Sequence, residues 1–102
     1  MIAIVLPIDE GHAVAHAYDD GRAAERILIA AGMLGLGAGI AWIRDDVRRA
    51  VGELLHVPVD RYVRTIVALG HPTERARAPK SEPGTARLPR GETVYEDRWR
   101  DG

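Results

Sequence analysis

The chain has 102 residues, enough for one small domain that buries roughly 60–68% of the surface exposed by its unfolded form. It contains no cysteine, which excludes a disulfide framework, a cysteine-ligated zinc or iron–sulfur centre, and a thiol nucleophile. The net charge of −1 argues against nucleic-acid binding through overall positive charge. No apolar run is long enough to span a bilayer. Because the first residues lack the features of a signal peptide, we expect a cytoplasmic protein that binds neither nucleic acid nor membrane.

The first third of the chain predicts a buried strand and a central helix. Residues 1–6 form a continuous apolar run, which is typical of a strand that is buried on both faces and has neighbours on either side. Residues 8–17 follow neither period and predict a loop. Asp19 or Asp20 can cap a helix that runs to about Leu34. Because this helix has almost no polar side, we expect other elements to wrap it.

A glycine-rich turn, an amphipathic helix and a second strand follow. The alternating glycines of residues 35–39 supply a left-handed helix C-cap and a turn where backbone can approach a ligand. Asp45 and Asp46 suit the start of a second helix, which Pro58 ends. Residues 62–69 predict a strand. The apolar stripe of the second helix consists of Val47, Ala50, Val51, Leu54 and Leu55.

Beyond Pro72 the composition changes to prolines and basic residues. We therefore expect residues 1–72 to form an α+β core and residues 73–102 an extended arm, in which residues 93–95 form a short edge strand and Trp99 is an apolar anchor. Two strands and a short third cannot bury both faces and both edges of a sheet. We infer an obligate oligomer, or the second half of a larger domain whose first half lies on another polypeptide or was lost from the reading frame.

Short motifs occur in a fixed order along almost the whole chain. They are Asp19-x-Gly-x-Ala, Leu34-Gly-Leu-Gly, Trp42-Ile43, Leu55-x-x-Pro, the strand end Ala68-Leu-Gly-x-Pro, and Arg87-x-Pro before the ending Val94-x-x-x-x-Trp. In this order and spacing they resemble the C-terminal half of the flavin-dependent nitroreductase family. The resemblance implies a nitroreductase-like α+β sandwich that forms a homodimer, binds FMN at the subunit interface, and wraps the C-terminal arm of one subunit around the other.

The resemblance also implies an activity and site residues. Hydride passes from NADH or NADPH to FMN and then to a nitroaromatic or quinone-like acceptor, with the flavin supplying the chemistry. Ala41, Trp42 and Ile43 match the positions where the family lays backbone over the N5 and O4 edge of the flavin. Arg87 matches the arginine that meets the FMN phosphate, a role that suits the fixed fork of guanidinium donors.

Two departures from the family limit what the chain does alone. Many members have lysine two residues before the phosphate arginine, whereas this chain has Thr85, so Lys80 or Arg90 would have to replace it. The family's N-terminal half, with most of the other FMN contacts, is missing from these residues. We therefore expect a homodimer or a complementing N-terminal half as the partner, and little activity from the isolated chain. The alternative function is a non-catalytic dimerisation or binding module derived from the same fold.

Other patterns have plainer interpretations. The glycines of residues 35–39 follow a helix instead of opening one, which favours a capping turn over a phosphate loop. His12 and His16 have a spacing that could provide two metal ligands on a helix, but in a loop they are solvated, so we predict no metal site. The basic residues of the arm lack interleaved aromatics, which argues against nucleic acid. Arg48 and Arg49 are expected on the exposed face of the second helix.

Overall fold

A computed structural model describes residues 1–99 of the chain, so residues 100–102 of the predicted arm lie outside the described residues. The chain divides into two units, Met1–Pro72 and a second unit that begins at Thr73. The first unit is built on a three-stranded antiparallel sheet with helices, which confirms the predicted α+β class. Within residues 1–99, every helix is too short or too polar to cross a membrane.

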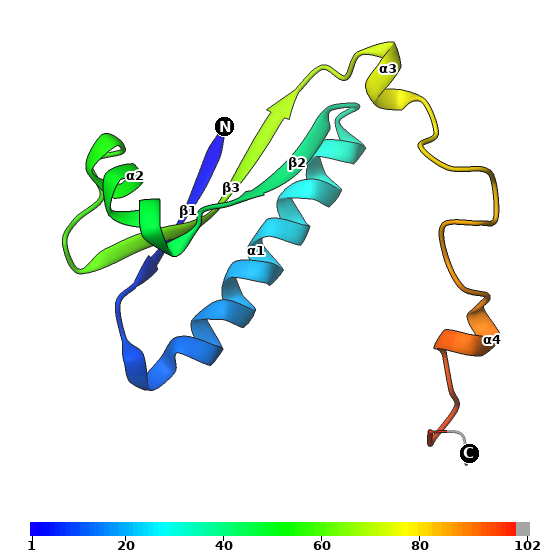
Figure 1. Cartoon of the computed structure of the whole chain (residues 1–102), viewed down its shortest axis with the longest axis horizontal. Helices are drawn as coiled ribbons and strands as arrows, with labels where there is room; N and C mark the ends of the chain where they lie inside the picture. The colour runs from blue at the N-terminus through cyan, green and yellow to red at the C-terminus, as the bar shows by residue number, and fades with distance from the viewer. Residues whose placement is uncertain (100–102) are drawn as a thin grey trace. The chain divides into compact units, whose positions relative to one another are not determined.

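Strand β3 (Arg61–Gly70) lies at the centre of the sheet. Both β1 (Ile2–Pro7) and β2 (Gly37–Trp42) pair with it in antiparallel fashion, in the order β1-β3-β2 (Figure 1). Strand β1 is therefore an edge strand within the described part of the chain, and Ile2 and Val5 are 39% and 44% exposed. The prediction of a first strand buried on both faces is wrong, because a continuous apolar run does not reveal how many neighbours a strand has.

A β-bulge interrupts the pairing of β1 with β3. Ile4 lies opposite Thr65, whereas the next residue, Val5, lies opposite Val63. Arg64 is thus an extra residue without a partner in β1. Bulges of this kind bend a strand and change the direction of a side chain, so Arg64 need not follow the regular alternation of β3.

Helix α1 (Ala13–Met33) covers one face of the sheet and contacts all three strands (Figure 1). It begins directly after a 3-10 turn at Glu10–His12, without a capping side chain. The predicted loop over residues 8–17 is therefore wrong from Ala13 onward, and the predicted cap at Asp19 or Asp20 is wrong. Both aspartates lie inside the helix, where Asp20 accepts a hydrogen bond from Thr65 of β3 and Asp19 is exposed and pairs with Arg22 one turn along.

The end of α1 confirms the predicted glycine cap. Gly35 has a φ of +72°, and the N–H groups of Gly35 and Leu36 donate to carbonyls one turn back at 3.1 and 2.8 Å. These two bonds form a Schellman motif, which needs a left-handed residue. The chain then enters β2 at Gly37, where a Cβ atom would lie 3.2 Å from Pro72. The sequence did not predict β2, since glycines are depleted in strands.

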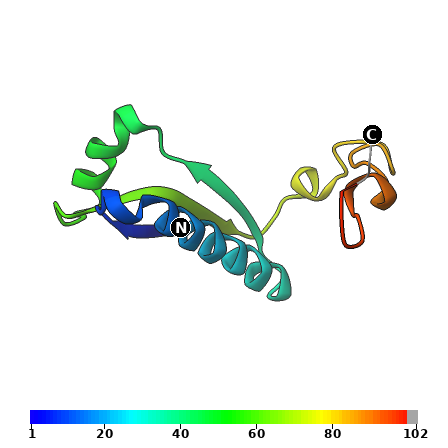
Figure 2. The same ribbon diagram turned by 90° about the horizontal axis from the view of Figure 1, so that it is seen from below.

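Helix α2 (Arg48–Leu54) lies on the side of the sheet opposite α1 (Figure 2). It continues a 3-10 turn at Asp45–Val47, close to the predicted start, but it ends before Pro58. None of its residues is buried, and Leu54 is 78% exposed. The predicted stripe therefore meets the sheet only in part, with Arg48 lying against Tyr62 of β3.

The second unit contains two single-turn helices, α3 (Glu74–Arg77) and α4 (Arg90–Thr93). The hydroxyl of Thr73 accepts a hydrogen bond from an α3 amide at 3.2 Å and caps that helix. The predicted edge strand over residues 93–95 is wrong, because Thr93 closes the turn of α4 instead. The Trp99 ring stands 4.6 Å from the Tyr95 ring and remains 76% exposed, so within this unit it anchors no core.

The hydrophobic core is small. Among residues 1–99, the buried hydrophobic side chains are Leu6, Ala24, Ala31, Val63 and Val67. The side of α1 turned away from the sheet is exposed and mixed: helical spacing places Arg22 and Glu25 among its large apolar residues, which are Val14, Tyr18, Ile29 and Met33. Large apolar side chains gathered on an exposed side, interspersed with charges, are compatible with an interaction surface.

Candidate functional site

The residues that the resemblance assigns to the flavin edge lie on and just after β2. The Ile43 N–H donates to the Arg64 carbonyl at 2.9 Å and is therefore committed to the sheet. Because N–H groups alternate in direction along an antiparallel strand, the Ala41 N–H also points toward β3 and the Trp42 N–H points away from it. No strand within residues 1–99 pairs with that outer edge. Trp42, whose side chain is 70% exposed, thus offers the free backbone donor of the three.

Arg87 belongs to the second unit, whereas the β2 residues belong to the first. Its side chain is exposed and pairs with no carboxylate in the part of the chain that the structure describes. Lys80 and Arg90, the candidate substitutes for the family lysine, are exposed as well. The hydroxyl of Thr85 donates to the carbonyl of Glu82 at 2.7 Å, which is a local turn contact.

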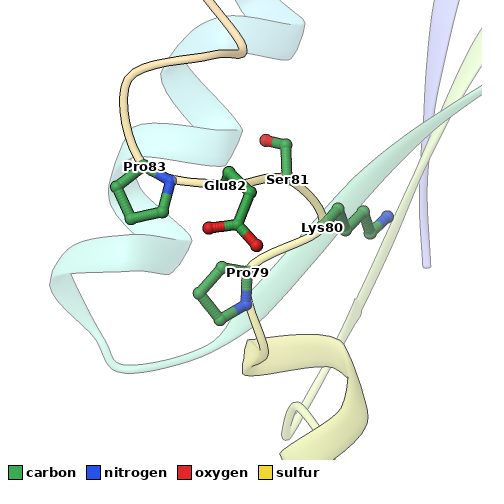
Figure 3. A pocket seen from close by; sticks show the side chains of 5 residues that line it. All are labelled: Pro79, Lys80, Ser81, Glu82 and Pro83. Carbon is green, nitrogen blue, oxygen red and sulfur yellow. The ribbon is translucent and has the colours of Figure 1, made fainter.

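A wide recess in the second unit is formed by the consecutive residues Pro79–Pro83. Figure 3 shows the Glu82 carboxylate beside the two proline rings, while the Lys80 side chain points away from it. No group from a distant part of the sequence converges there. This recess is therefore a bend in the arm, and we assign it no ligand.

A buried polar pair lies between α1 and β3. The Thr65 hydroxyl donates to Asp20 Oδ2 at 2.7 Å, and the two residues are only 4% and 5% exposed. The other carboxylate oxygen, Asp20 Oδ1, is buried and has no hydrogen-bond partner. Sequence reasoning missed this pair because Asp20 was interpreted as a helix cap. Its one signal was a charged residue on a helix that is otherwise apolar at the positions facing the sheet.

A small recess of about 150 Å³ opens beside this pair. Trp42 of β2 and Arg64 of β3 both line it. The guanidinium carbon of Arg64 lies 5.2 Å from the centre of the Trp42 ring, which is a cation–π distance. The full set of lining residues is Ala17, Asp20, Gly21, Ala24, Ile40, Trp42, Arg64 and Thr65. The recess thus combines a carboxylate, a guanidinium and an aromatic ring.

The two histidines near the start of α1 surround Asp9. His12 Nδ1 lies 2.8 Å from Asp9 Oδ2, and His16 Nε2 lies 4.0 Å from the same oxygen. The hydrogen bond from His12 lowers the pKa of Asp9 below its ordinary value of 3.8. Contrary to the predicted loop, His16 is part of α1. Within residues 1–99, no group of three or more His, Cys, Asp or Glu side chains is suitably placed for a metal ion.

The prediction that Arg48 lies on the exposed face of the second helix is wrong in part, because its side chain is mostly buried. Its side chain is 29% exposed, it forms an ion pair with Asp45, and its guanidinium lies 4.9 Å from the centre of the Tyr62 ring. It helps to line a hollow of about 560 Å³ between α2 and the start of β3. Arg49 fulfils the prediction, because it is exposed and pairs with Glu53 at 3.0 Å along the helix.

Comparison with protein families, curated proteins and solved structures gives no match for this chain. Support for a function therefore comes from the geometry of the described residues and from the order of the sequence motifs.

Proposed function

We propose that the chain forms the C-terminal half of an FMN-dependent oxidoreductase of the nitroreductase type. In such an enzyme, bound FMN supplies hydride transfer from NADH or NADPH to a nitroaromatic or quinone-like acceptor. The role of this chain is to provide one edge of the flavin site, part of the phosphate contact, and a surface for the subunit or half-domain that completes the fold.

The observation that carries the proposal is the free outer edge of β2. The Trp42 N–H points away from β3 on an edge that no strand within residues 1–99 occupies. A fixed backbone donor of this kind suits a flavin heteroatom that accepts a hydrogen bond, and it requires no side-chain rearrangement on binding. The Trp42 donor also lies in the motif that the resemblance assigns to the flavin.

The exposed guanidinium of Arg87 supports the phosphate contact. It makes no ion pair with any carboxylate of residues 1–99, so all of its donors are available to an anion. A phosphate accepts two parallel N–H bonds from such a group. Thr85 leaves the contact without the second cation common in the family, so we expect Arg87 to carry most of the phosphate binding in this chain.

The large exposed apolar residues on the outer side of α1 support the need for a partner. Val14, Tyr18, Ile29 and Met33 are between 55% and 84% exposed. Burying such side chains contributes about 1.5–3 kcal/mol each. A second copy or a complementing N-terminal half that covers this side would enlarge a core which is otherwise small for a domain.

The test measures FMN binding by flavin fluorescence. It uses the full chain alone and the full chain mixed with a polypeptide that contains the N-terminal half of a nitroreductase-type enzyme. We expect weak binding alone and strong binding in the complemented assembly. Arg87→Ala should weaken the latter by roughly 10- to 100-fold, which corresponds to one hydrogen bond to a charged group. Arg77→Ala is the matched control, since it removes another exposed arginine of the same unit. Failure of the complemented assembly to bind FMN would overturn the proposal.

A non-catalytic dimerisation module is the second candidate, and the exposed side of α1 favours it equally. The two candidates differ in flavin retention. A module of this kind would form a stable dimer in sedimentation experiments and retain no FMN after purification or complementation, whereas the oxidoreductase half retains FMN once the fold is complete.

A further inference from the structure

The recess between α1 and the end of β2 has the features of a second ligand site, which shares Trp42 with the proposed flavin edge but uses its ring instead of its backbone N–H. Asp20 is one of its lining residues; its side chain is more than nine-tenths buried and uses only one of its two carboxylate oxygens in a hydrogen bond. A buried polar atom without a partner costs free energy, so such an atom beside an open recess indicates a missing donor.

The opposite wall provides complementary groups. The bulge leaves Arg64 unpaired with β1, and its guanidinium lies over the Trp42 ring. Within the described residues, Arg64 makes no ion pair, so its N–H donors are available to an acceptor at the recess. The site therefore offers an acceptor, a donor and an aromatic wall within one small volume.

We propose that this recess binds a small planar amide, either a carboxamide or the N–H and C=O edge of a lactam. The amide N–H donates to Asp20 Oδ1, the amide carbonyl accepts from Arg64, and the planar group packs beside the Trp42 ring. Asp20 Oδ1 has no hydrogen-bond partner but is buried, so side chains at the recess must shift for the amide to reach it. The inference is independent of FMN binding, because Asp20 and Arg64 belong to neither the β2 edge donor nor the phosphate contact.

The charge of the recess selects this class of ligand. A cation would be attracted by Asp20 but repelled by the guanidinium that lies over Trp42, and an anion would be attracted by Arg64 but repelled by Asp20. A neutral ligand with one donor and one acceptor avoids both repulsions. A single ordered water would satisfy Asp20 Oδ1 as well, but the recess has roughly ten times the space that one water needs.

The experiment uses the full chain carrying Trp99→Phe, so that Trp42 is its single tryptophan. Benzamide is the probe, and benzylamine and benzoate share its ring but carry a cationic and an anionic head group. Binding is followed without FMN by the chemical shift of the Trp42 indole N–H and by its fluorescence. We expect benzamide to give a saturable change in the millimolar range, with both charged analogues at least about tenfold weaker.

Two variants test the assigned contacts. Asp20→Asn and Arg64→Gln should each weaken benzamide binding by about tenfold or more, the effect of losing one charge-assisted hydrogen bond. Asp19→Asn is the matched control, because it alters the adjacent exposed carboxylate of α1. Arg64 lies at a bulge and is not buried, so Arg64→Gln keeps the test valid if Asp20→Asn fails to fold.

Three outcomes would overturn the proposal. Absence of a saturable benzamide response shows that the recess holds water only. Tighter binding of benzylamine shows a cation site. Tighter binding after Arg64→Gln shows that Arg64 itself closes over Asp20 and competes with the ligand.

Discussion

The buried contact between α1 and β3 should contribute measurably to the stability of the first unit, and Thr65→Val tests this. Valine keeps the shape of threonine but removes the hydroxyl that donates to Asp20 Oδ2 at 2.7 Å. The other oxygen of Asp20 already lacks a partner, so the substitution leaves a buried carboxylate with no hydrogen bond. A hydrogen bond to a charged group contributes about 1.5–3 kcal/mol, and the unpartnered carboxylate places the expected loss in the upper half of that range.

The assay is urea unfolding of the full chain, followed by circular dichroism at a fixed protein concentration. For a domain of this size, with an m-value of about 1–2 kcal/mol/M, a loss of about 2 kcal/mol lowers the midpoint by about 1–2 M. Thr85→Val is a closely matched control, because its hydroxyl also donates at 2.7 Å but on an exposed turn. We expect that variant to lose less than about 0.5 kcal/mol.

A double-mutant cycle with Asp20→Ala then isolates the pairwise contribution. If the interpretation is right, Thr65→Val has little further effect once the Asp20 carboxylate is gone, and the interaction free energy is at least about 1 kcal/mol. Equal losses for Thr65→Val and Thr85→Val, or additive effects of the two buried substitutions, would refute the reasoning.

Three further predictions concern the helix cap, pH and activity. Gly35→Ala should destabilise the chain by about 1–2 kcal/mol, because the φ of Gly35 is +72° and alanine is strained there. Gly32→Ala should stabilise the chain by about 0.5–1 kcal/mol, because Gly32 lies within α1 and an added Cβ would meet no other atom. Thermal unfolding that shows stability changes of the same sign for both variants would contradict this prediction. The hydrogen bond from His12 to Asp9 contributes stability that is present above pH 3.8 and is lost as the pH falls through the lowered pKa of Asp9. An NMR titration of the Asp9 carboxyl carbon should therefore show a midpoint below 3.8 in the chain and a higher midpoint after His12→Ala, because His12 is the largest cause of the lowering. The isolated chain with excess FMN should oxidise NADPH, with a quinone as acceptor, no faster than free flavin does, and turnover well above that level would show that the half fold is a complete site.

The amino-acid sequence was sufficient to predict features that depend on local chemistry. The glycine cap at Gly35 follows from the need for a left-handed residue at the end of a helix, and the structure confirms it. The second helix starts near Asp45 and the last strand covers the predicted residues 62–69, since both have a clear period and clear boundary residues. The α+β class follows from these elements.

Only the tertiary structure decided features that depend on contacts between distant residues. Strand β2 forms despite its glycines because β3 provides a partner along its whole length. Asp20 lies inside α1 because Thr65, 45 residues away, donates a hydrogen bond to it, whereas local propensity favoured a cap at that position. The recess is lined in part by Arg64, the residue at the bulge, and no residue pattern predicts that bulge. Periodicity and capping are encoded over a few residues, but strand order, bulges and buried polar pairs depend on where the folded chain brings its segments together.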